Sequence, residues 1–172
     1  MDGVDAVVHT AALHAPHVSQ KSEREFRSIN VDATQQLLDR AVSCGVTRFL
    51  LTSSTSVYGD AVVPADRAVW VNEDVTPLPR DVYDATKLEA ESRALSAPLS
   101  AAVLRIARCF PEPVAIRAAH RLHRGVAVED VARAHRLALQ RPEVHITANI
   151  SGPTPFRPSD VQPLWEDAAQ VV

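Results

Sequence analysis

The sequence predicts an α/β protein built on an open sheet of parallel strands, with helices on both faces. Four short apolar runs have the length and composition of buried strands: residues 6–12, 48–53, 101–106 and 146–150. Segments with helical start and stop signals separate these runs. Strands joined through a helix need a crossover and therefore lie parallel, so the alternation predicts a doubly wound α/β fold.

The first helix is predicted from its two ends and its apolar face. Ser22 and Glu25 form a capping-box pattern, in which each side chain accepts a hydrogen bond from the other residue's backbone N–H. Gly45 follows the last periodic residue and predicts the end of the helix. One face of the helix carries Val31, Thr34, Leu37, Leu38, Ala41 and Val42.

The remainder of the chain adds one long loop and four predicted helices. Residues 59–81 are polar and contain prolines, and a loop of this length inside a compact domain is usually functional. Asp81 can cap the next helix, which extends to about Ala94. Further helices are expected at residues 114–124, at 129–140 with Val131, Ala132, His135, Ala138 and Leu139 inward, and after a second capping box at Ser159–Gln162.

Length and composition exclude several classes of protein. A chain of 172 residues with 46% hydrophobic residues is expected to form a single domain over residues 1–172. A net charge of -3 gives no basic field for nucleic acid, and no apolar run is long enough to cross a membrane. Residues 1–5 lack the basic start of a signal peptide, and Cys44 and Cys109 form no short-spaced pair, so we expect a cytoplasmic protein.

Tyr83 and Lys87 form the strongest candidate catalytic pair. They are four residues apart on a predicted helix and therefore share one face. An ammonium beside a phenol stabilises the phenolate, which lowers the tyrosine pKa and gives a general acid/base for a hydroxyl or ketone. A surface tyrosine that lies beside a lysine without catalytic purpose is the alternative interpretation.

A cluster of hydroxyl side chains follows the second predicted strand, in the segment Ser53–Gly59 (Ser-Ser-Thr-Ser-Val-Tyr-Gly). Ligands of open α/β sheets bind at the carboxyl ends of the strands, so a hydroxyl there can hydrogen-bond a substrate oxygen. The alternative is a Ser/Thr turn that only caps the strand end.

Six motifs follow one another along residues 4–152: Val7–Ala12, Asn30–Thr34, Gly45–Phe49, Ser53–Gly59, Tyr83–Lys87 and Leu104-Arg105. In this order and at these spacings they resemble the extended short-chain dehydrogenases/reductases, the NAD-dependent epimerase/dehydratase family. The resemblance implies a Rossmann-like sheet, an NAD or NADP cofactor and a small-molecule substrate.

The resemblance also assigns roles to individual residues. Tyr83 resembles the catalytic acid/base, Lys87 the residue that lowers its pKa and holds the nicotinamide ribose, and Ser54 the residue that orients the reacting oxygen. Asn30 matches an asparagine near the cofactor. The strand-end segment that lies along the cofactor is matched by Thr10, Ala11, Ala12, Leu13 and His14.

Two features depart from the family pattern. The family's Gly-x-x-Gly-x-x-Gly turn cradles the cofactor pyrophosphate, but the glycines here are too far apart to form it: Gly3, Gly45, Gly59, Gly125 and Gly152. We therefore expect a truncated Rossmann-like sheet without its first three strands, weak or absent NAD(P) binding, and Met1 as an internal start or the chain as a remnant. Thr55 and Ser56 also stand where the family's dehydratases carry Asp-Glu, which disfavours 4,6-dehydration.

Two functions are compatible with these observations. The first is an NAD(P)-dependent oxidoreductase or epimerase that acts on a hydroxyl or keto group, as in a sugar derivative, with Tyr83 as acid/base. The second is a non-catalytic remnant that serves as a binding or interaction module. Loss of the strands beside residues 6–11 would leave an apolar sheet edge, so we expect a homo-oligomer.

The histidines and arginines are also candidates for a metal site and an anion-binding site. The sequence supports these sites less strongly than the catalytic pair Tyr83 and Lys87. The seven histidines show no metal-ligating spacing on a helix with an acidic partner, so no metal site is expected. Five arginines either hold a phosphate or carboxylate or form a solvated helix face: Arg105, Arg108, Arg117, Arg121 and Arg124.

Overall fold

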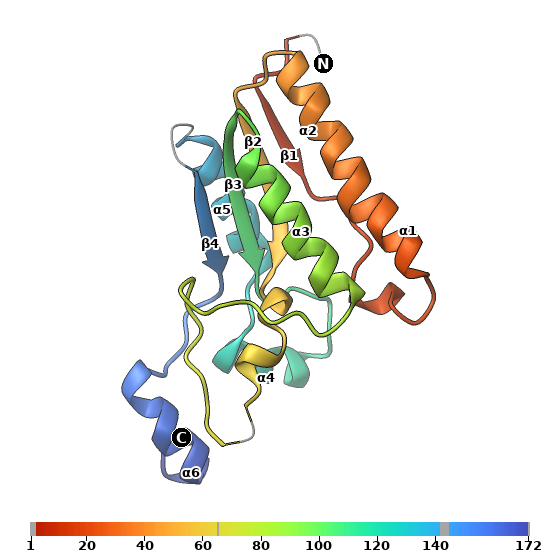
Figure 1. Cartoon of the computed structure of the whole chain (residues 1–172). Coiled ribbons are helices and arrows are strands. Elements are labelled where there is room, and N and C mark those ends of the chain that lie inside the picture. The colour runs from red at the N-terminus through yellow and green to blue at the C-terminus, as the bar shows by residue number, and fades with distance from the viewer. Residues whose placement is uncertain (1–2, 65, 142–144, 172) are drawn as a thin grey trace.

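The computed structural model describes residues 3–64, 66–141 and 145–171, and its centre is a parallel sheet (Figure 1). The strands pair in the order β1-β2-β3-β4, which confirms the predicted parallel arrangement. Their bounds are β1 Ala6–His9, β2 Arg48–Ser54, β3 Ser100–Ile106 and β4 Ile146–Ile150. The first strand is shorter than the predicted residues 6–12, because its sheet pairing ends where His9 meets Leu51.

The helical segment between β1 and β2 forms as its end signals predict, but with a π-helical turn inside it. It consists of α1 Glu23–Arg27, the π turn η2 Ser28–Asp32 and α2 Ala33–Ser43. The Ser22 hydroxyl accepts the backbone N–H of Glu25, whose carboxylate accepts the N–H of Ser22 at 2.9 Å, so the capping box is confirmed. Gly45 ends the segment with a φ of 71°.

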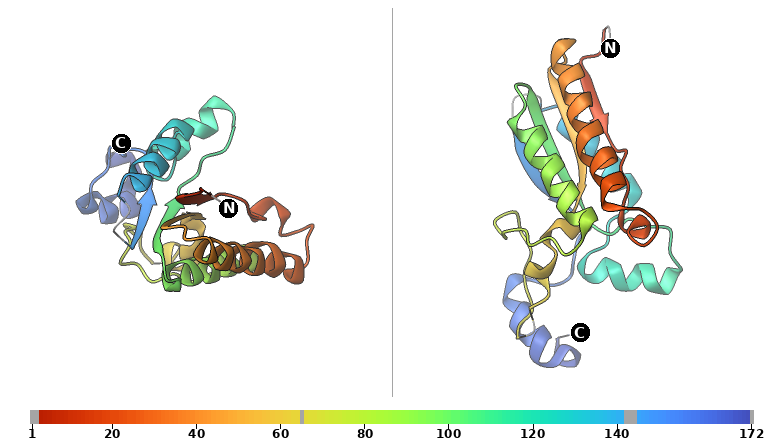
Figure 2. Two further views of the ribbon diagram at one scale, coloured as in Figure 1. Left: turned by 90° about the horizontal axis from the view of Figure 1, so that it is seen from above. Right: turned by 45° about the vertical axis from the view of Figure 1, so that its right-hand side comes forward.

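The helix α3, Val82–Ser96, follows the long loop and packs beside α2 on one face of the sheet (Figure 2). Asp81 caps it as predicted, with its carboxylate accepting the N–H of Asp84 at 2.9 Å. The main core lies between these helices and the sheet, where apolar residues pack together, among them Leu38, Ala41, Phe49, Leu51, Ala90, Ala94 and Val103.

The opposite face of the sheet carries α5, Val128–Leu139, so the doubly wound arrangement is confirmed (Figure 2). The inward positions are only partly as predicted: Val131, His135 and Ala138 are half-buried. Ala132 and Leu139 are exposed, so their inward placement is wrong. The helix contacts the sheet along a narrow stripe of residues spaced by three or four, and these two positions lie outside it.

Beyond the carboxyl ends of the strands lie α4, Val114–His123, and the C-terminal helix α6, Val161–Asp167 (Figure 1). The predicted capping box at Ser159–Gln162 is wrong. The 3-10 turn η5, Pro158–Asp160, comes first, and the Asp160 carboxylate accepts the N–H of Arg157 at 2.8 Å. The turn therefore starts at Pro158, one residue before the cap position that the pattern predicted.

Short 3-10 turns complete the chain: η1 Ala15–His17, η3 Thr55–Tyr58, η4 Asp60–Val62 and η6 Ala168–Gln170. No helix in the described ranges is both long and apolar enough to cross a membrane. The predictions that concerned Met1 and Asp2 lie outside the described residues.

Strand β1 lies at an edge of the sheet, and among the described strands only β2 pairs with it. The Val8 side chain on this strand is 42% exposed. The C-terminal helix α6 lies at the other end of the molecule and does not cover β1 (Figure 1). An edge strand with this composition presents unpaired backbone groups and apolar surface together.

Candidate active site

The carboxyl end of β2 and the first turns of α3 bring the three predicted catalytic residues together. The Ser54 hydroxyl accepts the backbone N–H of Ser56 at 3.1 Å and so starts the turn η3. Tyr83 is half-buried, and its hydroxyl interacts with the hydroxyl of Ser54. Lys87 lies one helical turn further along α3 and is only 3% exposed. A hydroxyl, a phenol and an ammonium therefore share one corner of the sheet.

The Tyr83 phenol does not have the lowered pKa that the sequence predicted. Burial raises its pKa above the ordinary value, and the nearby carboxylates Asp84 and Asp81 act in the same direction. The hydroxyls of Ser54 and Ser56 oppose the shift. Lys87 does not lower the Tyr83 pKa as predicted, because its ammonium points to the carbonyl of Thr52.

The Lys87 side chain points to the backbone of β2, where Nζ donates a hydrogen bond to the carbonyl oxygen of Thr52 at 2.6 Å. Burial lowers the pKa of Lys87 to about 8, and the negative charge of Glu91 opposes that change. An ammonium has three N–H donors. The bond to Thr52 uses one of them and fixes the side chain in place beside the site.

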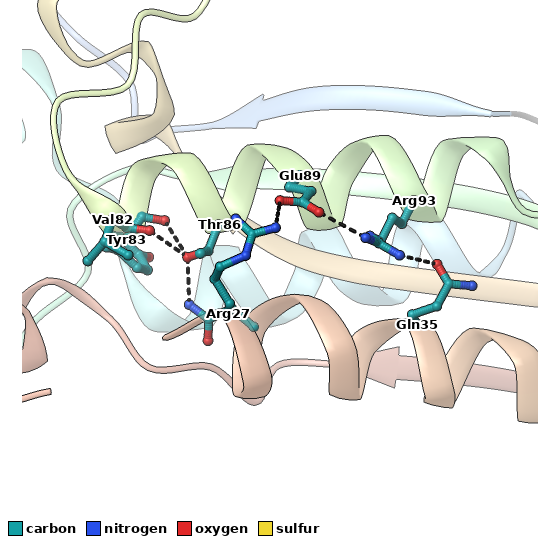
Figure 3. Close-up of polar contacts among 8 residues, drawn as sticks. Arg27, Gln35, Val82, Tyr83, Thr86, Glu89 and Arg93 are labelled. Carbon is teal, nitrogen blue, oxygen red and sulfur yellow. Dashed lines mark hydrogen bonds and ion pairs between the residues drawn. The ribbon is translucent and has the colours of Figure 1, made fainter. Parts of the chain in front are cut away.

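The strand-end segment that follows β1 is held by Asn30, which is buried in the π turn. The Asn30 amide accepts the N–H of Leu13 at 2.7 Å and donates to the carbonyl of Leu13 at 2.9 Å. It also donates to the Thr86 hydroxyl at 3.1 Å, and Thr86 donates in turn to the carbonyls of Val82 and Tyr83 (Figure 3). Since the amide of Asn30 is engaged within the chain, its evident role is to hold the segment and α3 together.

The other residues of the strand-end segment border the same corner of the sheet. Thr10 and Ala11 are exposed, whereas Ala12 and His14 are half-buried. The His14 ring stacks on Phe110 from the end of β3, with ring centroids 6.2 Å apart. The segments that follow β1 and β3 therefore meet beyond the carboxyl ends of these strands.

Two histidines lie behind the site, and the sequence predicted no role for either of them there. The Thr34 hydroxyl donates to the carbonyl of Asn30, so His9 donates from Nε2 to that hydroxyl at 2.9 Å. Burial, followed by the charge of Lys87, lowers the pKa of His9. His135 of α5 lies 2.7 Å from the Thr52 hydroxyl. The neutral ring of His9 thus lies at the end of β1, close to the buried ammonium.

The candidate anion-binding arginines have different surroundings. Arg105 is buried and bound to Glu91 at 2.7 Å, and Arg108 is paired with Glu112, so both charges already have partners inside the chain. Arg117, Arg121 and Arg124 are exposed on or beside α4. Within the described ranges, no group of three histidine, cysteine or acidic side chains could hold a metal ion.

The glycines test whether a cofactor pyrophosphate fits this chain. A Cβ at Gly59 would lie 1.9 Å from the carbonyl oxygen of Leu78, and one at Gly152 would lie 2.8 Å from that of Gly125. These close approaches are to the chain's own backbone, while Gly3 and Gly45 lie in open turns. None of these glycines therefore forms the closely spaced glycine-rich turn that holds a pyrophosphate.

A doubly wound parallel sheet with serine, tyrosine and lysine at the end of one strand is the arrangement of Rossmann-like short-chain dehydrogenases/reductases. Residues 1–110 match the NAD dependent epimerase/dehydratase family. The chain belongs to this family.

The chain is also similar to individual curated proteins and to solved structures. Methionine adenosyltransferase 2 subunit beta of Bos taurus is 36% identical over 62% of this chain and 30% of its own length. The dTDP-glucose 4,6-dehydratase of Streptomyces griseus is 34% identical over 63% of this chain and 32% of its own length. MoeE5 in complex with UDP-glucuronic acid and NAD superposes with a TM-score of 0.71 at 30% identity, covering 87% of this chain and 57% of that one. The chain thus spans about a third of these curated relatives and just over half of MoeE5.

Proposed function

We propose that this chain carries the acid/base part of an NAD(P)-dependent oxidoreductase or epimerase that acts on a hydroxyl or keto group of a sugar-derived substrate. The observation that carries the proposal is the meeting of Ser54, Tyr83 and Lys87 at the end of β2. Relatives of known substrate class support the sugar-derived part, since MoeE5 binds UDP-glucuronic acid. A nicotinamide cofactor supplies the hydride acceptor or donor in such a reaction.

Three residues of the chain account for proton transfer and for the orientation of the substrate and the cofactor. Ser54 donates a hydrogen bond that orients the reacting oxygen, and Tyr83 exchanges a proton with it. Because burial raises the Tyr83 pKa, the phenol is protonated near neutral pH and suited to give its proton to a keto oxygen. Lys87 would hold a ribose hydroxyl of the cofactor with the N–H groups that do not face Thr52. The test is a turnover assay with UDP-sugars and NAD(P), in which the chain is compared with its Tyr83→Phe variant.

We expect NAD(H) and NADP(H) to bind this chain weakly, with a dissociation constant of about 1 mM or more. The anchor of a dinucleotide is its pyrophosphate at a glycine-rich turn and helix N-terminus, and none of the glycines here forms that turn. Calorimetric titration measures the affinity. Low-micromolar binding would show that another segment replaces the turn.

A non-catalytic binding or interaction module is the second candidate. The missing glycine-rich turn favours it, and so does the relative that is named as the beta subunit of methionine adenosyltransferase 2. Under this alternative, the assay above gives no turnover even at saturating cofactor. UDP-glucuronic acid would then also leave the NMR signals of the two tyrosines, Tyr58 and Tyr83, unchanged.

We further propose that the chain acts as one domain and assembles into a homo-oligomer through the edge strand β1. A lysine on an edge strand blocks pairing, so Val8→Lys is expected to shift the assembly toward monomer. Val42→Lys is the matched control, since Val42 is 37% exposed on α2. Light scattering measures the mass of each variant. A wild-type chain that stays monomeric at high concentration would contradict the proposal.

A further inference from the structure

Three consecutive residues of β2 meet three successive turns of α3 behind the candidate site. The Ser54 hydroxyl faces Tyr83, the Thr52 carbonyl accepts Nζ of Lys87, and the Ser53 hydroxyl donates to the carboxylate of Glu91. Tyr83, Lys87 and Glu91 are spaced by four residues and therefore share one face of the helix. Of these three residues of α3, only Glu91 has no part in the proposed reaction. It nevertheless contributes to the same interface between β2 and α3 as Tyr83 and Lys87.

The surroundings of Glu91 hold its carboxylate in place. It is 2% exposed, and the guanidinium of Arg105 donates to it from Nε and from a terminal nitrogen, the latter at 2.7 Å. Arg105 pairs with Ser53 in the register of β2 and β3, so both reach Glu91 from the same face of the sheet. Arg105 also donates to the Tyr58 hydroxyl, which donates to Asn149 of β4. Glu91 is thus anchored by neighbouring strands.

We propose that Glu91 is a positioning residue for Lys87, in that its fixed carboxylate holds the ammonium-bearing face of α3 against the end of β2 and places a negative charge one helical turn from that ammonium. The importance of this role for catalysis rests on the proposed function. The effect of Glu91 on Lys87 does not depend on it. Burial works against the charge of Lys87, and Glu91 works for it. The other groups around this position are His9 from β1, Arg105 from β3 and His135 from α5.

The chain offers an unusually direct test, because it contains two lysines, Lys21 and Lys87. Lysine-labelled protein therefore gives two NMR side-chain signals, and Lys21 serves as the internal reference. In the wild type the Lys87 signal should titrate with a midpoint near 8. In Glu91→Gln we expect that midpoint to fall by roughly one pH unit, because the carbon skeleton stays and only the negative charge is lost.

Glu89→Gln is the matched control. It removes the same charge from the same helix, but Glu89 pairs with Arg27 and Arg93 on the surface (Figure 3). The Lys87 midpoint should not change in this variant. Glu91→Gln leaves Arg105 buried without its partner, which can prevent folding. The double variant Glu91→Gln/Arg105→Gln removes both charges and should show a smaller fall in the same direction, because the repulsion between Arg105 and Lys87 is removed as well.

An unchanged Lys87 midpoint in the folded Glu91 variants, or an equal fall in Glu89→Gln, would overturn the inference. The titration needs neither substrate nor cofactor, so it separates this inference from the proposed function. If Tyr83→Phe turns over at the wild-type rate while Glu91→Gln shifts the Lys87 midpoint, the proposed function fails and the positioning role stands.

Discussion

Replacing Tyr83 with phenylalanine is expected to reduce any turnover by at least about 10²-fold to 10⁴-fold, the usual contribution of a general acid/base. The change deletes one hydroxyl from a half-buried ring that faces Ser54, so the packing of the ring is retained. The rate is followed by chromatographic separation of the UDP-sugar substrate and product, at saturating cofactor and over a range of UDP-sugar concentrations. The loss should appear in kcat rather than in KM, because the proton moves only in the transition state.

Two comparisons make this result interpretable. Circular dichroism and thermal unfolding of Tyr83→Phe should match the wild type, since the substitution does not disturb the core between α2, α3 and the sheet. Ser54→Ala should give a smaller loss, because the orienting hydrogen bond is removed while the transferable proton stays. Equal rates for Tyr83→Phe and the wild type would place the chemistry at another group.

Replacing Lys87 with methionine is expected to stabilise the folded chain at neutral pH while it impairs the site. The pKa of Lys87 falls from 10.5 to about 8 on folding, which corresponds to a cost of about 3 kcal/mol for burying its charge. Methionine fills a similar volume without that cost. Loss of the hydrogen bond to Thr52 lowers this gain in stability by about 1 kcal/mol. The free energy of unfolding is therefore expected to rise by roughly 1–2 kcal/mol.

The pH dependence of this gain follows from linkage. Between about 8 and 10.5 the unfolded chain binds a proton at Lys87 that the folded chain has released, so wild-type stability rises with pH across that window. The advantage of Lys87→Met is therefore largest below about pH 8 and shrinks as the pH approaches 10.5. Urea unfolding at several pH values measures it.

Lys21→Met is the control for the stability measurement. Lys21 is the other lysine of the chain, and its side chain is 43% exposed in an ion pair with Glu25 on the surface. Exposed pairs of this kind contribute little, so its removal should change stability by less than about 1 kcal/mol. A Lys87→Met variant that is less stable than the wild type at pH 7 would mean that the charge of Lys87 is well compensated in the fold.

The sequence by itself determined the features that depend on neighbours along the chain. Period, cap and end signals located the four strands and the main helices, and Ser22, Gly45 and Asp81 end their segments as predicted. The spacing of Tyr83 and Lys87 fixed a shared helix face. These predictions hold because local hydrogen bonds and periodicity determine where strands and helices begin and end. Contacts with residues far away in the chain are not needed for them.

Only the tertiary structure decided what surrounds each side chain. The sequence placed Lys87 beside Tyr83, but the carbonyl of Thr52, 35 residues away, takes its ammonium. Burial then sets the Tyr83 pKa in the direction opposite to the predicted one. The spacing of Glu91 from Lys87 was visible in the sequence, yet its partners Ser53 and Arg105 were not. Burial and charge pairing depend on distances between segments that are far apart in the chain. Local sequence patterns do not determine those distances, so they do not predict these pKa values or ion pairs.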